Sequence, residues 1–291
     1  MFCFLKRRWK RLVTLVLVGL VAGLAVSWEK GSELCAPHNH SVAAPAGLEV
    51  NPVNFPSESG ATIQGWLVVP PSYHGVVILQ HGVRADRNQM VDRAKFLTAA
   101  GYAVLLFDFQ AHGESPGKQI TFGWLESRDS QAAVAFVKDR FPDQPIGIIG
   151  ISLGGAAALL AQPPLEVQAL VLESVYPTIV DATKDRLEWV WGRPARLLSP
   201  LLTFQIKLRI GISVNQLRPI DHVAEIKIPK LFLHGTLDSR TKFAEAEAMY
   251  TRAAEPKQFF PVEDAKHEDL HHFLGVRYEQ LVLEFLKQHL K

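Results

Sequence analysis

The amino-acid sequence predicts an α/β fold with a mostly parallel, doubly wound sheet flanked by helices. Short, continuously apolar runs such as 76–80 and 103–107 are typical of strands buried on both faces. These runs alternate with longer segments of helical pattern, as expected when helices connect parallel strands. A third observation is the stretch 145–160, where an isoleucine-rich run, a glycine- and serine-containing turn and an alanine-rich run follow one another.

The composition suits a globular domain with an attached segment. Of the 291 residues, 48% are hydrophobic and 21% are charged, which is ordinary for a protein with a sizeable core. The first 28 residues hold five basic residues and no acidic one, so the rest of the chain has 26 basic against 29 acidic residues. The globular part is therefore not basic, and nucleic-acid binding has no electrostatic support.

Residues 1–28 are expected to be a membrane anchor or a signal segment. Leu12 to Trp28 are 17 residues without a charge, at the short end of what spans a bilayer. An alternative is a cleavable signal peptide, because Ala25-Val26-Ser27 offers small residues before Trp28. In both cases the basic flank stays on the cytoplasmic side, and the globular domain lies on the other side of the membrane or is secreted.

Residues 29–47 are rich in proline, histidine and small residues and are expected to form a linker. The α/β domain then covers 48–291. In chain order, strands are expected at 62–69, 76–80, 103–107, 146–151, 169–172, 229–235 and 258–262. Helices are expected at about 88–100, 125–141, 153–160 and 243–253, with an amphipathic helix closing the chain.

The alternation breaks between residues 177 and 219. This segment has no clear strand pattern and is apolar and helical, with Trp189 and Trp191 among its large side chains. It is expected to be a short helical insertion. It could be an extra packed helix pair or a lid over the active site, and the two interpretations are compatible.

Ser152 is the expected nucleophile. It lies in Gly150-Ile151-Ser152-Leu153-Gly154, between the isoleucine-rich strand and the alanine-rich helix. Glycines at both ends of this motif leave room for a strained turn in which strand and helix nearly touch. The N-terminus of the following helix favours negative charge near the serine.

A serine hydroxyl needs a base, and the base needs a group that orients it. In parallel sheets catalytic groups gather at the carboxyl ends of strands. Asp238 follows the strand at 229–235, and His267 follows the strand at 258–262. We therefore expect a triad of Ser152, Asp238 and His267. The oxyanion donors should be the backbone N–H groups of Leu153 and Val83.

The sequence resembles the α/β-hydrolase superfamily over about residues 50–289, in the branch of membrane-associated and serine-aminopeptidase-like hydrolases. The matching motifs are His81-Gly82, Asp108…His112-Gly113-Glu114-Ser115, Gly150-x-Ser152-x-Gly154-Gly155, His234-Gly235…Asp238 and His267. The resemblance implies hydrolysis of an ester, thioester or amide through an acyl-enzyme. It does not identify the substrate.

Other residues at strand ends offer alternative roles. Glu173 follows the strand after the nucleophile helix, where some lipases have their acid. Asp108 also ends a strand, and the family usually uses that position to shape a loop. His81 and His112 resemble structural positions of the family, so we expect them to support the fold.

A competing motif shares the proposed base. His267-Glu268-x-x-His271 fits the zinc-protease pattern, with Glu279 or Glu284 as a third ligand. However, a strand and an acidic loop precede it where a zinc helix would continue. A further alternative is a non-catalytic relative that binds a lipid or a partner at the membrane.

We therefore expect a serine hydrolase that needs no cofactor and no metal. The apolar insertion favours a small or lipid-like ester as the substrate. A serine peptidase or aminopeptidase of the same fold is the next alternative. It would need an anionic patch for the substrate amine, and the sequence does not reveal one.

Overall fold

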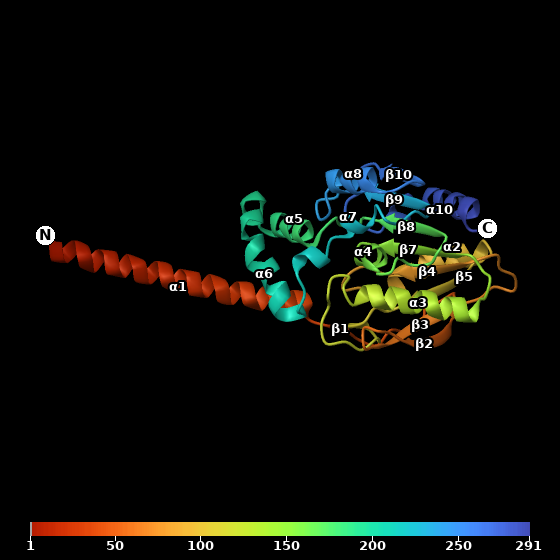
Figure 1. Ribbon diagram of the computed structural model, residues 1–291, viewed down its shortest axis with the longest axis horizontal. Coiled ribbons are helices and arrows are strands. Elements are labelled where there is room, and N and C mark those ends of the chain that lie inside the picture. The colour runs from red at the N-terminus through yellow and green to blue at the C-terminus, as the bar shows by residue number, and fades with distance from the viewer. Residues whose placement is uncertain (1) are drawn as a thin grey trace.

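The computed structural model describes residues 2–291, without the side chains of residues 2–8, 11, 12, 16 and 20. The orientation predicted for the N-terminal segment rests largely on Lys6, Arg7, Arg8 and Arg11, whose side chains lie outside the described ones. Figure 1 shows a layered body at one end of a long N-terminal helix.

Within the described residues, the body is built on an eight-stranded sheet in the order β10-β9-β8-β7-β4-β5-β3-β2. Its strands are parallel, except that β3 runs antiparallel to both β5 and β2. The sheet consists of β2 (Asn51–Pro56), β3 (Thr62–Val68), β4 (Val76–Gln80), β5 (Ala103–Phe107), β7 (Ile146–Ile151), β8 (Ala169–Glu173), β9 (Lys230–Gly235) and β10 (Lys257–Val262). The predicted α/β fold with a mostly parallel sheet is therefore confirmed.

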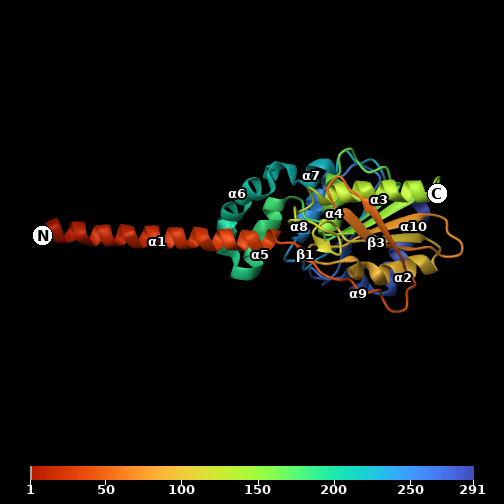
Figure 2. The same cartoon turned by 90° about the horizontal axis from the view of Figure 1, so that it is seen from below.

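Helices cover both faces of the sheet (Figures 1 and 2). One buried cluster joins the sheet to α3 (Glu126–Arg140), α4 (Leu153–Leu160) and α8 (Phe243–Arg252). A second joins the opposite face to α2 (Val91–Ala99), α9 (Leu270–Leu274) and α10 (Val276–His289). The short 3₁₀ helix η1 (Arg87–Met90) leads into α2. The central strands are buried throughout because both faces are covered.

The predicted strands agree with the structure to within one or two residues, but one strand of the eight-stranded sheet, β2, is not among those predicted. β2 pairs antiparallel with β3 at the edge of the sheet. It begins and ends near Pro52 and Pro56, and its side chains are mostly exposed. Proline cannot donate to a central ladder, but an edge strand tolerates it. Because of its prolines and polar residues, the sequence pattern does not predict this strand.

The N-terminal helix is longer than the apolar segment. α1 spans Phe2–Cys35, and its stretch Val13–Cys35 is long and apolar enough to cross a membrane by length and composition. A signal sequence meets the same criterion. The charged residues after Trp28 continue the helix, and Lys30 pairs with Glu33 one turn later at 2.7 Å.

The segment 29–47 differs from the predicted linker because it is packed against the domain. Its first residues are the last two turns of α1, and Cys35 is buried. β1 (His38–Asn39) then pairs in parallel with β6 (His112–Gly113). The proline and polar residues of this segment predicted a linker, but in the structure they pair and pack along the surface of the domain.

The insertion at 177–219 is helical, as predicted. It contains α5 (Ile179–Trp191), η2 (Arg193–Leu198), α6 (Ser199–Ile210) and η3 (Val214–Gln216), and α7 (Pro219–His222) returns the chain to the sheet. α5 and α6 lie beside each other at the end of the body where α1 arrives (Figure 2). We call α5, η2 and α6 the cap.

Candidate active site

Ser152 lies between β7 and α4 in a backbone conformation that is unfavourable for a residue with a side chain. Its φ is 48° and its ψ is −105°. Residues with positive φ that are not glycine carry strain, and such strain concentrates at functional sites. The sharp turn carries the chain directly from the strand into the N-terminus of α4.

The glycines beside Ser152 make this turn possible. A Cβ atom at Gly150 would lie 2.5 Å from the backbone nitrogen of Gly155, so strand and helix approach too closely for any side chain there. A Cβ atom at Gly154 would lie 2.3 Å from the carbonyl oxygen of Gln80 on β4. The close approach predicted from the two glycines is therefore present in the structure.

Asp238 and His267 meet although 28 residues separate them in the chain. Nδ1 of His267 lies 2.7 Å from Oδ2 of Asp238. The other carboxylate oxygen of Asp238 accepts the backbone N–H groups of Arg240 at 2.8 Å and Thr241 at 2.9 Å. Burial acts to raise the pKa of Asp238, but the hydrogen bond and charge of His267 and the Thr241 N–H outweigh it, so the pKa is lowered.

An ionised Asp238 fixes the imidazole. The carboxylate can only accept hydrogen bonds, so Nδ1 of His267 carries the proton and Nε2 remains an acceptor. The hydroxyl of Thr241 also donates to Oδ2 of Asp238 at 2.8 Å and lies 3.2 Å from the imidazole Nδ1. Thr241 therefore helps to hold the pair. It lies in a loop without a motif, so no sequence pattern predicts this role.

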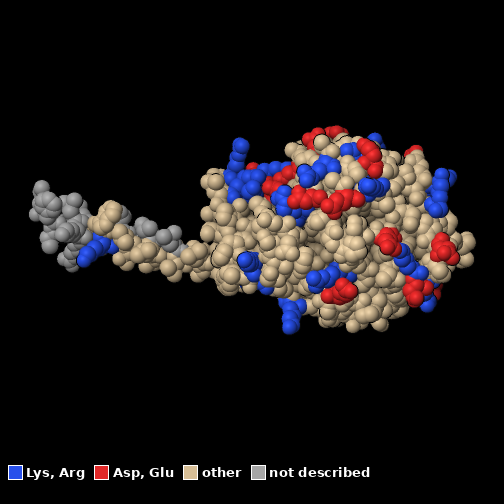
Figure 3. All heavy atoms as spheres, viewed as in Figure 1, with Lys and Arg blue, Asp and Glu red and all other residues tan. Residues whose placement is uncertain are grey.

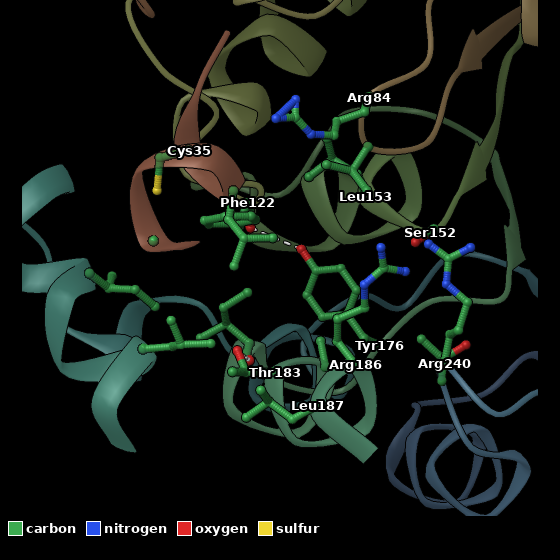
Figure 4. Close-up of a pocket in the computed structure, with 18 of the residues that line it drawn as sticks. Cys35, Arg84, Phe122, Ser152, Leu153, Tyr176, Thr183, Arg186, Leu187 and Arg240 are labelled. Carbon is green, nitrogen blue, oxygen red and sulfur yellow. Dashed lines mark hydrogen bonds between the residues drawn. The ribbon is translucent and has the colours of Figure 1, made fainter. Parts of the chain in front are cut away.

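Ser152 and His267 line one cavity of about 290 Å³. Figure 4 shows Ser152 at one end of the cavity and Cys35 toward the other. Among the hydrogen bonds of the described residues, none joins Ser152 Oγ to His267, whose Nδ1 contacts are Asp238 and Thr241. In unliganded enzymes such a contact is often long and tightens when substrate binds.

The two residues whose backbone N–H groups are predicted as oxyanion donors lie at the same cavity. Leu153 and Val83 both line it. Leu153 is the first residue of α4, where N–H groups have no partner within the helix. The neighbouring N–H groups have partners: Ser152 N–H donates to Glu173 O at 2.8 Å, and Gly82 N–H donates to the Gln89 side chain at 2.8 Å.

His81 and His112 are buried in the fold. Nδ1 of His81 is 2.7 Å from Gly82 O, and its Nε2 accepts the N–H of Phe109 at 3.1 Å. Burial lowers the pKa of His81 to about 4 and that of His112 to about 4. Both rings are therefore neutral, as residues that support the turn after β4 would be.

Asp108 and Glu173 form buried ion pairs with arginines and form no hydrogen bond with His267. Asp108 forms a buried ion pair with Arg87. Glu173 is 1% exposed, and Arg93 donates to its two oxygens at 3.2 and 2.7 Å. The hydroxyl of Tyr278 also donates to Glu173. Glu173 therefore belongs to a buried hydrogen-bond network with Arg93 and Tyr278, and its oxygens do not bind His267.

The two histidines of the zinc-like motif line two different hollows of the structure. His267 lies in a loop before α9 and lines the Ser152 cavity. His271 lies within α9 and lines a separate hollow, with Nε2 3.0 Å from Oε1 of Glu279. Within residues 2–291 as described, no group of three or more His, Cys, Asp or Glu side chains is arranged to hold a metal ion. The helical arrangement that a zinc-protease motif requires is not formed here.

The far wall of the cavity comes from segments that the sequence did not connect to the site. α1 contributes Gly31, Leu34 and Cys35, and α6 contributes Leu202 and Ile206 among others. Four arginines also line the cavity: Arg84, Arg186, Arg209 and Arg240. These contributions depend on how α1 and the cap pack together, which no local sequence pattern predicts.

Comparisons with known proteins indicate the family and the fold of the chain. Residues 71–202 match the family model described as serine aminopeptidase, S33. The chain is 27% identical over 236 residues to the uncharacterized protein YqkD of Bacillus subtilis, covering 80% of this chain and 77% of that protein. It is 29% identical over 210 residues to the α/β-hydrolase domain-containing protein WAV2 of Arabidopsis thaliana, covering 68% and 65%.

Among solved structures, the esterase Pf2001 of Pyrococcus furiosus superimposes with a TM-score of 0.73 and 26% identity, covering 89% of this chain and 99% of the esterase. An α/β-hydrolase from Penicillium, GrgF, shares the fold with a TM-score of 0.67 at 20% identity. The sheet order, the strained serine turn and these similarities together show that the chain belongs to the α/β-hydrolase superfamily, and within it residues 71–202 match the serine-aminopeptidase family.

Proposed function

We propose that the chain is a membrane-anchored serine hydrolase that cleaves carboxylic esters or thioesters through an acyl-enzyme. The observation that carries the proposal is the 2.7 Å contact between His267 Nδ1 and Asp238 Oδ2, at the cavity that Ser152 also lines. In this mechanism Ser152 Oγ attacks the carbonyl carbon while its proton passes to Nε2 of His267. Asp238 orients the ring and stabilises its positive charge.

The next steps use the same groups. The N–H groups of Leu153 and Val83 bind the oxyanion of the tetrahedral intermediate, assisted by the N-terminus of α4. As the intermediate collapses, the bond to the leaving alcohol or thiol breaks, and His267 returns the proton to it. Water then attacks the acyl-enzyme with His267 as base, and Ser152 is released.

The walls of the cavity favour an ester over a peptide with a free amino group. Among the residues that line the cavity there is no aspartate or glutamate, whereas four are arginines. An aminopeptidase must bind a protonated amine, and a positive cavity opposes this. The similarity to the esterase Pf2001 also supports ester hydrolysis. Aminopeptidase activity remains an alternative because of the family model matched by residues 71–202.

The outer surface of the cap supports a location at a membrane. Large apolar side chains on η2 and α6 are exposed next to α1, and Leu197 is 84% exposed. On α6, Leu201, Phe204 and Leu208 form one stripe at helical spacing. Figure 3 shows few charged side chains on the visible surface where α1 joins the body. We propose that α1 spans the membrane uncleaved, with the hydrolase on the non-cytoplasmic side and the cap against the lipid.

The test is active-site labelling of the full chain in a neutral detergent. A fluorophosphonate probe should label the wild-type protein at Ser152, and Ser152→Ala should abolish both labelling and hydrolysis of a short p-nitrophenyl ester. Treatment with phenanthroline, a zinc chelator, should change neither the labelling nor the hydrolysis by the wild-type protein. Hydrolysis that survives in the purified Ser152→Ala protein, or that is lost only to the chelator, would contradict the proposal. A folded wild-type protein that neither labels nor hydrolyses would indicate a non-catalytic relative.

A further inference from the structure

Two cationic side chains that line the cavity have no acidic partner among the described residues. Arg186 comes from α5 of the cap, and Arg240 comes from the loop after β9 that also carries Asp238. Both line the cavity with Ser152 and His267. Within the described part of the chain, neither forms an ion pair with a carboxylate.

The two guanidiniums lie over the same aromatic ring. The Arg186 guanidinium lies 4.7 Å from the centroid of the Trp189 ring, and that of Arg240 lies 5.5 Å from the same ring. Burial and the positive charge of Arg240 lower the pKa of Arg186, as expected for two like charges brought together. Two cations over one indole repel each other unless an anion lies between them.

The carboxylates near this pair are occupied by other cations. Asp185 and Glu188 of α5 both pair with Arg196, at 2.5 and 2.7 Å. Lys242 pairs with the same two carboxylates, at 3.5 and 2.6 Å. The charges of Asp185 and Glu188 are therefore balanced by Arg196 and Lys242, and the positive charge of Arg186 and Arg240 is left to face the cavity.

The opposite part of the cavity is lined mainly by apolar side chains, namely Leu34 of α1 and Leu202 and Ile206 of α6, together with Cys35. Two polar residues of α6 also line it, but they are hydrogen-bonded to each other and to α1: Arg209 donates to Gln205 Oε1 at 3.0 Å and to Trp28 O at 2.6 Å. In Figure 4 Arg186 and Arg240 lie on the same side of the cavity as Ser152, and Cys35 lies across from them. A ligand that fits this arrangement has a hydrocarbon chain at one end and negative charge at the other, with the reacting carbonyl between them.

We propose that Arg186 and Arg240 form an anion-binding subsite that selects acyl esters carrying a phosphate group. A phosphate monoester offers three terminal oxygens, enough for both planar guanidiniums to bind it with two hydrogen bonds each or to share an oxygen. The apolar part of the cavity holds the acyl chain, and Ser152 attacks the ester carbonyl. This inference rests on the proposed ester hydrolysis and adds the class of substrate, an anionic amphiphile.

The test measures how well small amphiphiles protect Ser152 from the fluorophosphonate probe in the full chain. Octyl phosphate should protect at concentrations about ten-fold or more below those of 1-octanol, because charge-assisted hydrogen bonds are each worth a factor of this order. Inorganic phosphate alone should protect weakly, which separates an amphiphile from a free anion. Raising the salt concentration should reduce the advantage of octyl phosphate.

Variants then connect the preference to the two arginines. Arg186→Gln and Arg240→Gln, with each protection curve normalised to the variant's own labelling rate, should lower the preference for octyl phosphate about ten-fold and leave protection by octanol unchanged. Arg128→Gln is the matched control, since Arg128 also lies over a tryptophan, 5.3 Å from the Trp124 ring, but does not line the cavity.

The outcomes separate the inference from the function on which it rests. Labelling of Ser152 without a preference for octyl phosphate, or with the same preference in wild type and in both variants, overturns the anion subsite and leaves the serine hydrolase standing. Protection by inorganic phosphate as strong as by octyl phosphate overturns the amphiphile. Absence of labelling in the wild type overturns the proposed function and this inference together.

Discussion

Oδ2 of Asp238 accepts two hydrogen bonds at once, from His267 Nδ1 at 2.7 Å and from the hydroxyl of Thr241 at 2.8 Å. The first aligns the imidazole, and the second fixes the carboxylate that aligns it. Because Oδ1 is also held by two backbone N–H groups, the carboxylate has little freedom to turn away. This rigidity is what a base needs if its unprotonated nitrogen is to face the nucleophile.

Asp238→Asn should therefore lower kcat for a short ester by about 10³-fold, without a matching rise in KM. The amide keeps the shape of the carboxylate, but it can present an N–H to Nδ1 and so favours the wrong imidazole tautomer. Steady-state kinetics would measure the loss, and thermal unfolding would check that the fold is intact. A variant with wild-type kcat would show that another group orients His267.

Glu173→Gln should damage stability and not catalysis. The substitution leaves Arg93 buried with a weakened partner, and losing one member of a buried ion pair costs about 3–5 kcal/mol. The retained amide oxygen and the link from Arg93 to Asp269 should reduce this loss. Chemical denaturation would measure the change in unfolding free energy. At a temperature where the variant is folded, kcat per molecule should equal that of wild type; a drop as large as that of Asp238→Asn would point to Glu173 as the acid.

Asp129 should make the stability depend on pH. It is fully buried, accepts the Gln110 N–H at 2.9 Å and lies 2.6 Å from Ser57 Oγ. Burial raises its pKa to about 7. Since the folded state holds the proton more tightly than the unfolded state, the stabilising contribution is complete below about pH 4 and is lost as the pH rises to about 7.

Asp129→Asn separates this contribution from the other titrating groups. The amide is neutral at every pH, and its N–H₂ and C=O can replace the protonated carboxyl toward Ser57 and Gln110. The variant should match wild type near pH 4 and exceed its unfolding free energy by about 2–4 kcal/mol at pH 8. Urea denaturation at several pH values would measure both. A difference that does not change with pH would contradict the assignment.

Gly31→Leu should disturb the contact between α1 and the cap. A Cβ atom at Gly31 would lie 2.2 Å from Oε1 of Gln205, which is buried and donates to Ser27 O at 3.0 Å. A leucine must displace Gln205 and reshape the cavity wall. We expect a changed preference for acyl chain length with little change in the melting temperature. Gly19→Leu is the control, because Gly19 has open space around it. Equal effects of the two substitutions would contradict the role of this contact.

The strands and the serine turn could be predicted because their signals are local. Buried runs such as Val76–Gln80 and the paired glycines of 150–154 leave few alternatives. The order Ser152, Asp238, His267 follows from strand ends, and the structure brings the last two into contact. β2 could not be seen because its prolines are acceptable only at an edge, which is a property of the sheet and not of the segment.

The contribution of α1 and the cap to the cavity could not be predicted for a similar reason. Nothing in residues 29–35 distinguishes a helix that enters the cavity wall from a polar flank of a membrane segment. Arg186 and Arg240 lie on different elements, and they are related by their shared contact with Trp189 and by the cavity that both line. Such relationships arise from tertiary packing, whereas sequence patterns report on single elements.

The end of α1 also limits how this protein can be simplified. Arg84 donates to the carbonyl of Glu33, Arg209 donates to that of Trp28 at 2.6 Å, and Leu34 and Cys35 close the cavity. A soluble version made by deleting the first 35 residues would lose this wall as well as its anchor. Substrate preferences measured on such a truncated protein would describe a wider, more hydrated cavity. A version that keeps the native wall must retain Ser27, to which Gln205 donates, and therefore has to be cut before that residue.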